Sequence, residues 1–423
     1  MTLTLRILAA LVAGLLSGAA LAAADVGWLP AAAGFARAAG GLWLDALRMT
    51  IVPLVFALLV SGVASAAGAA RAGRMAARTF GFFAVLLLAA SAFAAIVVPM
   101  VLSVAPIPVQ AVAPLREALG APSANVPGLP PFGEWLRSFI PVNPVGAAAE
   151  GAMVPLVIFG LVFGLAATRI EPELRDRIVG LFEAVVRTML VIVGWVLWAA
   201  PAGVLALSFV VGASAGLGAA GGLLHYVLTV CGVCLAVTLA MYPFARVAGG
   251  VPLMRFARAV GPAQLVAFST QSSIASLPAM TLAVQQLAVP VEAGRLVLPL
   301  AVSLFRITSA VANMTVAIYA AALFGAVPGP AQLATGAVVA AIVSLAAVGL
   351  PSQVSFFTAI SPVCLAMGVP LQALPLLLAV ESIPDIFRTV GNVTADVAVT
   401  AAVGRKASAR DGEGGARTER PLS

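Results

Sequence analysis

The sequence predicts an all-α integral membrane protein that crosses the bilayer many times. Its 423 residues are 62% hydrophobic and only 9% charged, whereas soluble domains carry roughly 25% charged residues. Its apolar runs are about twenty residues long or more and lack the strict alternation of a membrane β-barrel. This composition excludes a water-soluble enzyme, a nucleic-acid-binding protein and a disordered chain.

Six apolar runs in the first part of the chain predict spanning helices. The first could pass for a signal peptide, but the many runs that follow it favour a spanning helix. A long polar connection rich in proline, residues 105–143, separates the third run from the fourth. The predicted spans cover residues 5–24, 42–67, 79–104, 144–168, 188–211 and 223–246.

Arginines concentrate in alternate loops. If the N-terminus is cytoplasmic, the inside loops within residues 71–78, 169–187 and 246–258 hold ten arginines, whereas the outside loops hold only Arg37, Arg116 and Arg137. Basic residues remain on the cytoplasmic side of a membrane. We therefore expect both termini to be cytoplasmic in a bacterial-type inner membrane, with a disordered tail over residues 405–423.

Two later segments each combine half-length apolar flanks with an interrupted centre. Residues 259–291 carry no formal charge, yet their middle reads Phe268-Ser-Thr-Gln-Ser-Ser-Ile-Ala-Ser-Leu-Pro278, and Gly349-Leu-Pro-Ser-Gln353 interrupts residues 331–368. Flanks of about ten residues are half of what a spanning helix needs. The pattern predicts two re-entrant hairpins, which are typical of a transporter binding site. Two kinked spanning helices are the alternative.

Two ordinary spans, residues 296–324 and 371–403, complete a prediction of eight transmembrane helices plus two re-entrant helical hairpins. The last span carries a polar stripe whose members are separated by 4, 3, 4 and 4 residues. This spacing places them within an arc of roughly 60° on a helix, with Thr389 beside them. The stripe consists of Glu381, Asp385, Arg388, Asn392 and Asp396.

The stripe contains three carboxylates and one arginine. A charge at the bilayer centre costs from about 3 to over 10 kcal/mol, and one arginine cannot neutralise three carboxylates. The surplus indicates a bound cation, a bound proton or another positive group, and a purely structural ion-pair network is the alternative. Arg306 in the preceding span either balances Glu381 or Asp396, or extends its charged end to the interface.

These motifs together resemble the glutamate/aspartate–cation symporters of the dicarboxylate/amino acid:cation symporter family. The resemblance extends from about Leu5 to Gly404, and its most specific parts are residues 269–278, Asn313-Met314 and Asp385-Ile-Phe-Arg-Thr-Val-Gly-Asn-Val-Thr-Ala-Asp396. It implies a homotrimer with a glutamate-transporter-like elevator fold. Residues 1–254 would be mainly scaffold, with the third and sixth helices linking to transport, and residues 255–404 would form the moving transport core.

The resemblance also implies a role for each site residue. Arg388 would hold a side-chain carboxylate of the substrate, and Asp385 would hold its ammonium group. Glu381 and Arg306 would balance charge or carry a proton. The other implied substrate contacts are Ser272, Ser273, Met314, Thr389 and Asn392, the sodium ligands are Asn313, Asn392, Asp396 and Ser344, and the gate contains Gly349 and Pro351.

Some positions depart from the family pattern. Thr315 stands where the motif usually continues with Asp, and Leu87 and Ala90 stand where sodium-coupled members have Tyr and Thr. These departures point to the loss of a third sodium site, so coupling could use fewer sodium ions, or protons carried by Glu381 or Asp385.

We therefore expect a secondary active symporter that imports acidic amino acids with Na⁺ and/or H⁺. The alternative is a symporter of C4-dicarboxylates such as succinate, malate or fumarate. Asp385 disfavours that alternative, because a carboxylate facing a dianion would repel it. The chain contains no nucleotide motif or nucleophile–base pair, so we expect neither enzymatic activity nor a cofactor.

Overall fold

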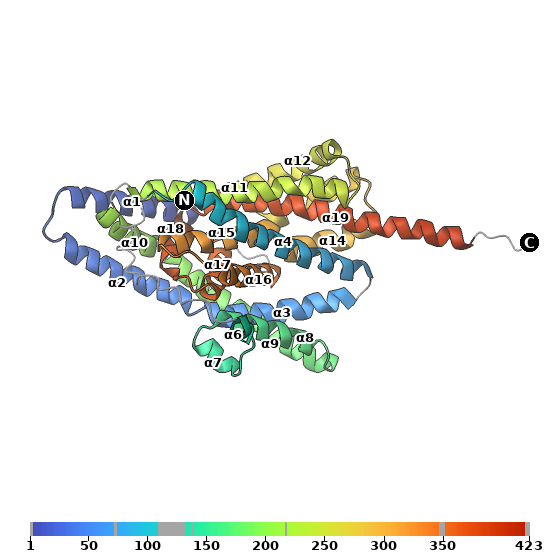
Figure 1. The fold of residues 1–423 in the computed structure, drawn as a ribbon, viewed down its shortest axis with the longest axis horizontal. Coiled ribbons are helices and arrows are strands. Elements are labelled where there is room, and N and C mark those ends of the chain that lie inside the picture. Colours follow the sequence, from blue (N-terminus) through green and yellow to red (C-terminus); the bar gives the residue numbers. More distant parts are fainter. Residues whose placement is uncertain are drawn as a thin grey trace, which may run out of the picture.

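The computed structural model describes residues 3–71, 74–108, 132–137, 139–215, 218–346 and 352–418, and these residues are folded as helices without strands (Figure 1). The first half contains α1 (Leu3–Ala23), α2 (Leu29–Arg48), α3 (Ile51–Arg71), α4 (Arg74–Val104), α6 (Phe132–Arg137), α7 (Pro144–Ala149), α8 (Met153–Ala167), α9 (Pro172–Trp198), α10 (Ala200–Ala215) and α11 (Gly218–Val247). The second half contains α12 (Leu253–Thr270), α13 (Ser273–Gln286), α14 (Val291–Leu304), α15 (Ile307–Leu323), α16 (Pro330–Ala346), α17 (Ser352–Ala366), the 3₁₀ turn η1 (Leu371–Ala373), α18 (Leu374–Ala379) and α19 (Ser382–Thr418).

Among the described residues, six helical stretches are long and apolar enough to cross a membrane. The shorter apolar helices, such as α8, α10 and α16, have 15 to 17 residues. The fold is therefore all-helical with several long apolar helices, as the composition predicts. The six stretches are Leu5–Ala23, Leu29–Ala64, Arg74–Val104, Pro172–Trp198, Ala220–Val247 and Val291–Leu323.

Several predicted spans have different boundaries in the structure. The run over residues 188–211 is not one helix, because α9 ends at Trp198 and α10 begins at Ala200. Pro201 falls in the first turn of α10, where the missing N–H of proline costs nothing. The continuous apolar sequence conceals this break. The charged residues before position 188 belong to α9, which begins at Pro172.

Helices α1, α2 and α10 form one packed group. α1 and α10 approach closely because glycines face the neighbouring backbone. A Cβ atom added at Gly18 would overlap the carbonyl oxygen of Phe209, and one added at Gly212 would overlap that of Leu15. Small residues permit such close contact between membrane helices, where packing rather than the hydrophobic effect drives association.

A second group is built around α19, which packs against α11, α12, α13, α14 and α15. In Figure 1, α19 and α11 run side by side along the length of the molecule. Gly391 lies where three of these helices meet, because a Cβ atom there would overlap the side chains of Thr308 on α15 and Thr238 on α11. The centre of α19 is thus enclosed by protein.

Helices in this group are interrupted at defined points. α12 and α13 pack against each other across Gln271, which has left-handed backbone angles (φ 52°, ψ 31°). The apolar spans predicted over residues 296–324 and 371–403 are each broken, at Arg306 and at Glu381 respectively. The expected gate residues Gly349 and Pro351 lie outside the described residues.

The helix α19 continues past Gly404 to Thr418, where we predicted a disordered tail (Figure 1). Residues 405–410 contain alanine, arginine and lysine, which are favourable in helices, whereas the glycines at 412, 414 and 415 are unfavourable. Extending an existing helix also avoids the unfavourable nucleation step.

Candidate functional site

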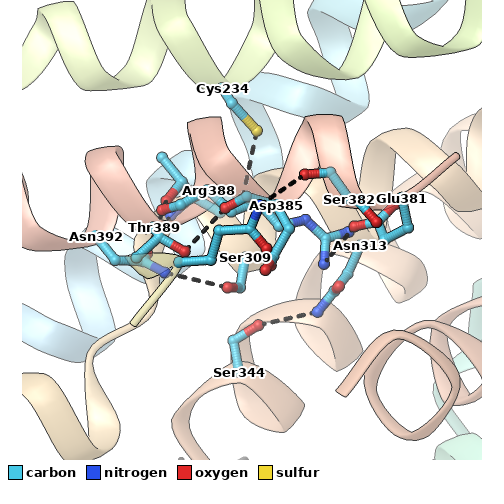
Figure 2. A network of polar contacts seen from close by, with 12 residues as sticks. Cys234, Ser309, Asn313, Ser344, Glu381, Ser382, Asp385, Arg388, Thr389 and Asn392 are labelled. Carbon is cyan, nitrogen blue, oxygen red and sulfur yellow. Dashed lines mark hydrogen bonds and ion pairs between the residues drawn. The ribbon is translucent and has the colours of Figure 1, made fainter. Parts of the chain in front are cut away.

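The polar stripe of α19 faces the interior of the protein (Figure 2). The exposed fractions are 2% for Glu381, 9% for Asp385, 4% for Arg388 and 0% for Asp396. Charged groups removed from water need partners, because the cost of leaving them unpaired is high. The partners present in the protein therefore show which groups remain open to a ligand.

Arg388 is paired on one side only. Its Nη1 atom lies 3.1 Å from Oε1 of Glu381, although the contact lacks hydrogen-bond geometry. The hydroxyl of Tyr226 on α11 donates to Glu381 Oε2 at 3.0 Å. The Nε and Nη2 atoms of Arg388 are buried and have no hydrogen-bond partner among the described residues. These two donors form the edge of a guanidinium that can hold a carboxylate with two parallel hydrogen bonds.

Asn392 joins α19 to the beginning of α15. Its Oδ1 accepts a hydrogen bond from the backbone N–H of Thr308 at 3.0 Å. The single hydroxyl hydrogen of Thr308 is shared between this Oδ1 at 2.7 Å and the backbone oxygen of Arg388 at 2.6 Å. The Nδ2 atom of Asn392 donates to Ser309 Oγ at 3.3 Å. The amide thus supplies an acceptor for the first turn of α15, where backbone donors lack partners within the helix. Thr389 donates to the backbone oxygen of Asp385 at 2.8 Å.

Buried oxygen atoms without partners mark where a cation could bind. Both carboxylate oxygens of Asp396 and the Oδ1 atom of Asn313 are buried without a hydrogen-bond partner in the described part of the chain. Asn313 Nδ2 donates to Ser344 Oγ on α16 at 3.3 Å, so α15 and α16 meet there. Carboxylate and amide oxygens are hard ligands and fit an alkali cation. The described hydrogen bonds do not connect Asn313 with Asp396.

Arg306 lies in the break between α14 and α15 and is partly buried. It interacts electrostatically with Asp385 and Asp396, whereas Glu381 takes Arg388 as its ion-pair partner. The charge-balancing role of Arg306 stays a prediction.

The turn between α12 and α13 lies at the beginning of α19. Gln271 Nε2 donates to the backbone oxygen of Ser382 at 3.3 Å. Ser272 caps the N-terminus of α13, and its Oγ accepts from the backbone N–H of Ala275 at 3.2 Å. Ser272 and Ser273 are both partly exposed. The serine-rich turn and the first residues of the polar stripe are therefore neighbours.

Other residues singled out by the sequence are buried between helices. Met314, Thr315 and Leu87 have exposed fractions of 1% or less. The Thr315 hydroxyl donates to the backbone oxygen of Val311 at 2.8 Å, so its hydrogen is already used within α15. Ala90, which is also buried, has no side-chain oxygen to offer.

Sequence reasoning missed Tyr226, Thr308 and Ser309. The hydroxyl of a tyrosine within a spanning helix needs a hydrogen-bond partner, so Tyr226 carried a usable signal. Thr308 and Ser309 carried a weaker one, since hydroxyl side chains in membrane helices commonly bond to their own backbone.

The sequence matches the protein family described as "Sodium:dicarboxylate symporter family" over residues 3–406. The chain is 26% identical over 368 residues to the "Proton/glutamate-aspartate symporter" of Escherichia coli, covering 84% of this chain and 81% of that protein. It is 28% identical over 443 residues to the human "Neutral amino acid transporter A", covering 91% and 79%. It is 24% identical over 411 residues to the "C4-dicarboxylate transport protein" of Rhizobium etli, covering 95% and 88%.

Proposed function

The chain belongs to the sodium:dicarboxylate symporter family, and from this premise we propose that it is a secondary active symporter that imports glutamate or aspartate with Na⁺ and/or H⁺. Family membership makes the protein a multi-pass, cation-coupled membrane transporter and not an enzyme. The relatives include transporters of acidic amino acids, neutral amino acids and C4-dicarboxylates. We therefore infer the substrate from the residues of the site.

The observation that carries the proposal is the open edge of Arg388. Its Nε and Nη2 donors are buried and unpaired among the described residues, and the geometry of a guanidinium suits a carboxylate. A substrate with a neutral side chain would leave these donors without partners at a cost of about 1–3 kcal/mol or more. Arg388 therefore favours a substrate that has a second carboxylate in addition to its α-carboxylate.

Asp385 separates an amino acid from a simple dicarboxylate. It lies three residues before Arg388 on the same face of α19, with its side chain buried. A buried carboxylate attracts an ammonium group and repels a second carboxylate. This arrangement supports glutamate or aspartate over succinate, malate or fumarate.

The remaining roles complete the proposal. The turn at Ser272 and Ser273 receives the α-carboxylate, since the unpaired N–H groups at a helix N-terminus attract anions, and Met314, Thr389 and Asn392 line the same site. Gly349 and Pro351 act as the gate. The sodium ligands are Asn313, Asn392, Asp396 and Ser344.

We further propose that residues 255–404 move as a transport core against a scaffold in a homotrimer, in a bacterial inner membrane with both termini cytoplasmic. The dense packing of α1 and α2 with α10, and of α11–α15 with α19, supports this division. A buried site carried within one packed group could cross the membrane without taking its charges through lipid.

Uptake by proteoliposomes tests the function. Wild-type protein should accumulate labelled aspartate or glutamate uphill under an imposed Na⁺ or H⁺ gradient, and unlabelled succinate should compete poorly. Arg388→Ala should abolish this uptake, whereas Arg295→Ala, which removes an exposed arginine of α14, should retain it. Undiminished uptake by a folded Arg388→Ala variant would reject the assignment of the substrate.

A further inference from the structure

Arg306 is a partly buried positive side chain that substrate binding leaves without a role. It occupies the position before the first residue of α15, where the chain leaves α14. Arginines within membrane-spanning segments are costly and mark functional positions. A structural arginine would pair with a nearby carboxylate, but the ion pair of the core joins Arg388 and Glu381 instead.

The contacts of α15 place Arg306 near the C-terminal part of the polar stripe of α19. Thr308, two residues after Arg306, donates to Asn392 on α19. Asp396 follows Asn392 by four residues, which is one helical turn on the same face. Arg306 therefore enters the core at the level of the Asn392–Asp396 turn.

Asp396 has the greatest need of a positive partner. Its exposed fraction is 0%, and neither carboxylate oxygen has a hydrogen-bond partner among the described residues. Among the charged groups of the described residues, Arg306 is the one whose field acts on Asp396, and the same field also acts on Asp385. Within 4.0 Å no ion pair joins Arg306 and Asp396 in that part, so neither carboxylate oxygen of Asp396 is occupied by a salt bridge there.

We propose that Arg306 is a built-in counter-cation for Asp396, replacing one of the cations that the symporter would otherwise carry. The inference deepens the proposed function and rests on it. The three carboxylates and two arginines of the core sum to one net negative charge. A glutamate anion then requires two travelling cations for neutrality, whereas the same core without Arg306 requires three.

Sodium binding tests the inference without transport. Thermal unfolding of purified protein is followed while NaCl replaces choline chloride at constant ionic strength. A neighbouring charge changes ion affinity at a buried carboxylate by about ten- to a thousandfold. Arg306→Gln should therefore reach half-maximal stabilisation at a Na⁺ concentration at least about tenfold below that of the wild type. Arg306→Lys, which keeps the charge, and the exposed-site control Arg295→Gln should follow the wild type. Equal Na⁺ dependence of all four proteins would overturn the inference.

Reversal potentials in proteoliposomes then give the number of cations moved per substrate. Arg306→Gln should move one more cation than the wild type. An unchanged ratio in an active Arg306→Gln variant would overturn the role of Arg306 and leave the proposed function intact. Failure of the wild type to accumulate any acidic substrate would overturn the proposed function, while the sodium titration would still report on Arg306.

A variant that fails to fold is also informative. If Arg306→Gln unfolds, it is combined with Asp396→Asn, which removes the charge that Arg306 would otherwise balance. We expect the double variant to regain the cooperative thermal unfolding of the wild type. A double variant as unstable as Arg306→Gln alone would show that Arg306 does not serve Asp396.

Discussion

At the scale of single residues, the site is defined by which polar atoms have partners and which do not. Glu381 is held by two groups, Arg388 and Tyr226, and these contacts fix its side chain in a buried position. Because buried hydrogen bonds in a low-dielectric interior are costly to lose, Tyr226 orients Glu381 and thereby influences the arginine that we propose as the substrate ligand.

Replacing Tyr226 by Phe removes one hydroxyl and little volume. We expect the free energy of unfolding to fall by about 1–3 kcal/mol, since Glu381 loses a buried donor. Glu381 would then compete more strongly for Arg388, so KM for aspartate should rise. Tyr242→Phe is the matched control. The Tyr242 hydroxyl accepts a hydrogen bond from Gln264 at 3.0 Å, and no charged residue takes part in that contact. This control should lower stability without changing KM, and an unchanged KM in Tyr226→Phe would contradict the prediction.

Asp385→Asn tests the amine contact. The change preserves shape and removes the negative charge that attracts an ammonium group. We expect aspartate uptake to fall by at least about tenfold, the loss of roughly 1.4 kcal/mol of binding free energy, while competition by succinate strengthens. Competition measured with both compounds on one preparation checks the result, and a proportional loss for both would indicate general damage to the site.

At the scale of elements, breaks in the helices position the polar groups. α15 starts immediately after Arg306, and α19 starts immediately after Glu381, so each break lies next to a charged residue of the core. The close meeting of α11, α15 and α19 at Gly391 keeps these helix beginnings in register. The site therefore depends on packing at a residue that touches no substrate.

Gly391→Ala should destabilise the protein strongly. The added methyl group overlaps Thr308 and Thr238, and overpacking of a close-packed core costs typically about 1–3 kcal/mol. Gly232→Ala on α11 is the control, because nothing lies within 4 Å of a Cβ atom there. Thermal unfolding in one detergent distinguishes them. Equal stability of the two variants would argue against the close packing at Gly391.

The sequence predicts the elements and the stripe better than it predicts the breaks. The serine-rich segment around Ser272 and the spacing of the stripe are local patterns. In the structure, two helices, α12 and α13, meet at the serine-rich turn, and the stripe is a buried polar face. The breaks at Arg306 and Glu381 could not be read, because the apolar sequence continues on both sides and tertiary packing determines where the helices stop. The contact from Tyr226 to Glu381 joins residues 155 positions apart, and no local pattern encodes such a pairing.

At the scale of the whole molecule, the elevator proposal requires the two packed groups to slide past each other. Trp43 on α2, in the first group, and Phe357 on α17, which packs against α15 of the second group, form an edge-to-face contact with ring centroids 6.5 Å apart. The three native cysteines are all buried. Thiols introduced at this contact can therefore be cross-linked with little reaction of the native thiols.

A short bifunctional thiol reagent applied to Trp43→Cys with Phe357→Cys should block uptake. Substrate should still raise the melting temperature of the cross-linked protein, because the binding residues lie within one group. Each single variant treated with the reagent is the control, and reduction of a cleavable cross-link should restore transport. Uptake at the rate of the untreated protein after complete cross-linking would exclude relative movement at this contact.

The hydrogen bond from the backbone N–H of Thr308 to Asn392 has a thermodynamic consequence. A carbonyl oxygen has two lone pairs, and the backbone N–H of Thr308 occupies one of them at Asn392 Oδ1. A metal ion that recruits this oxygen therefore competes with the opening turn of α15 for it. By linkage, a change that loosens this turn raises the affinity of the ion site, and ion binding loosens the turn by the same free energy. Ion occupancy and local unfolding at the N-terminus of α15 are therefore coupled.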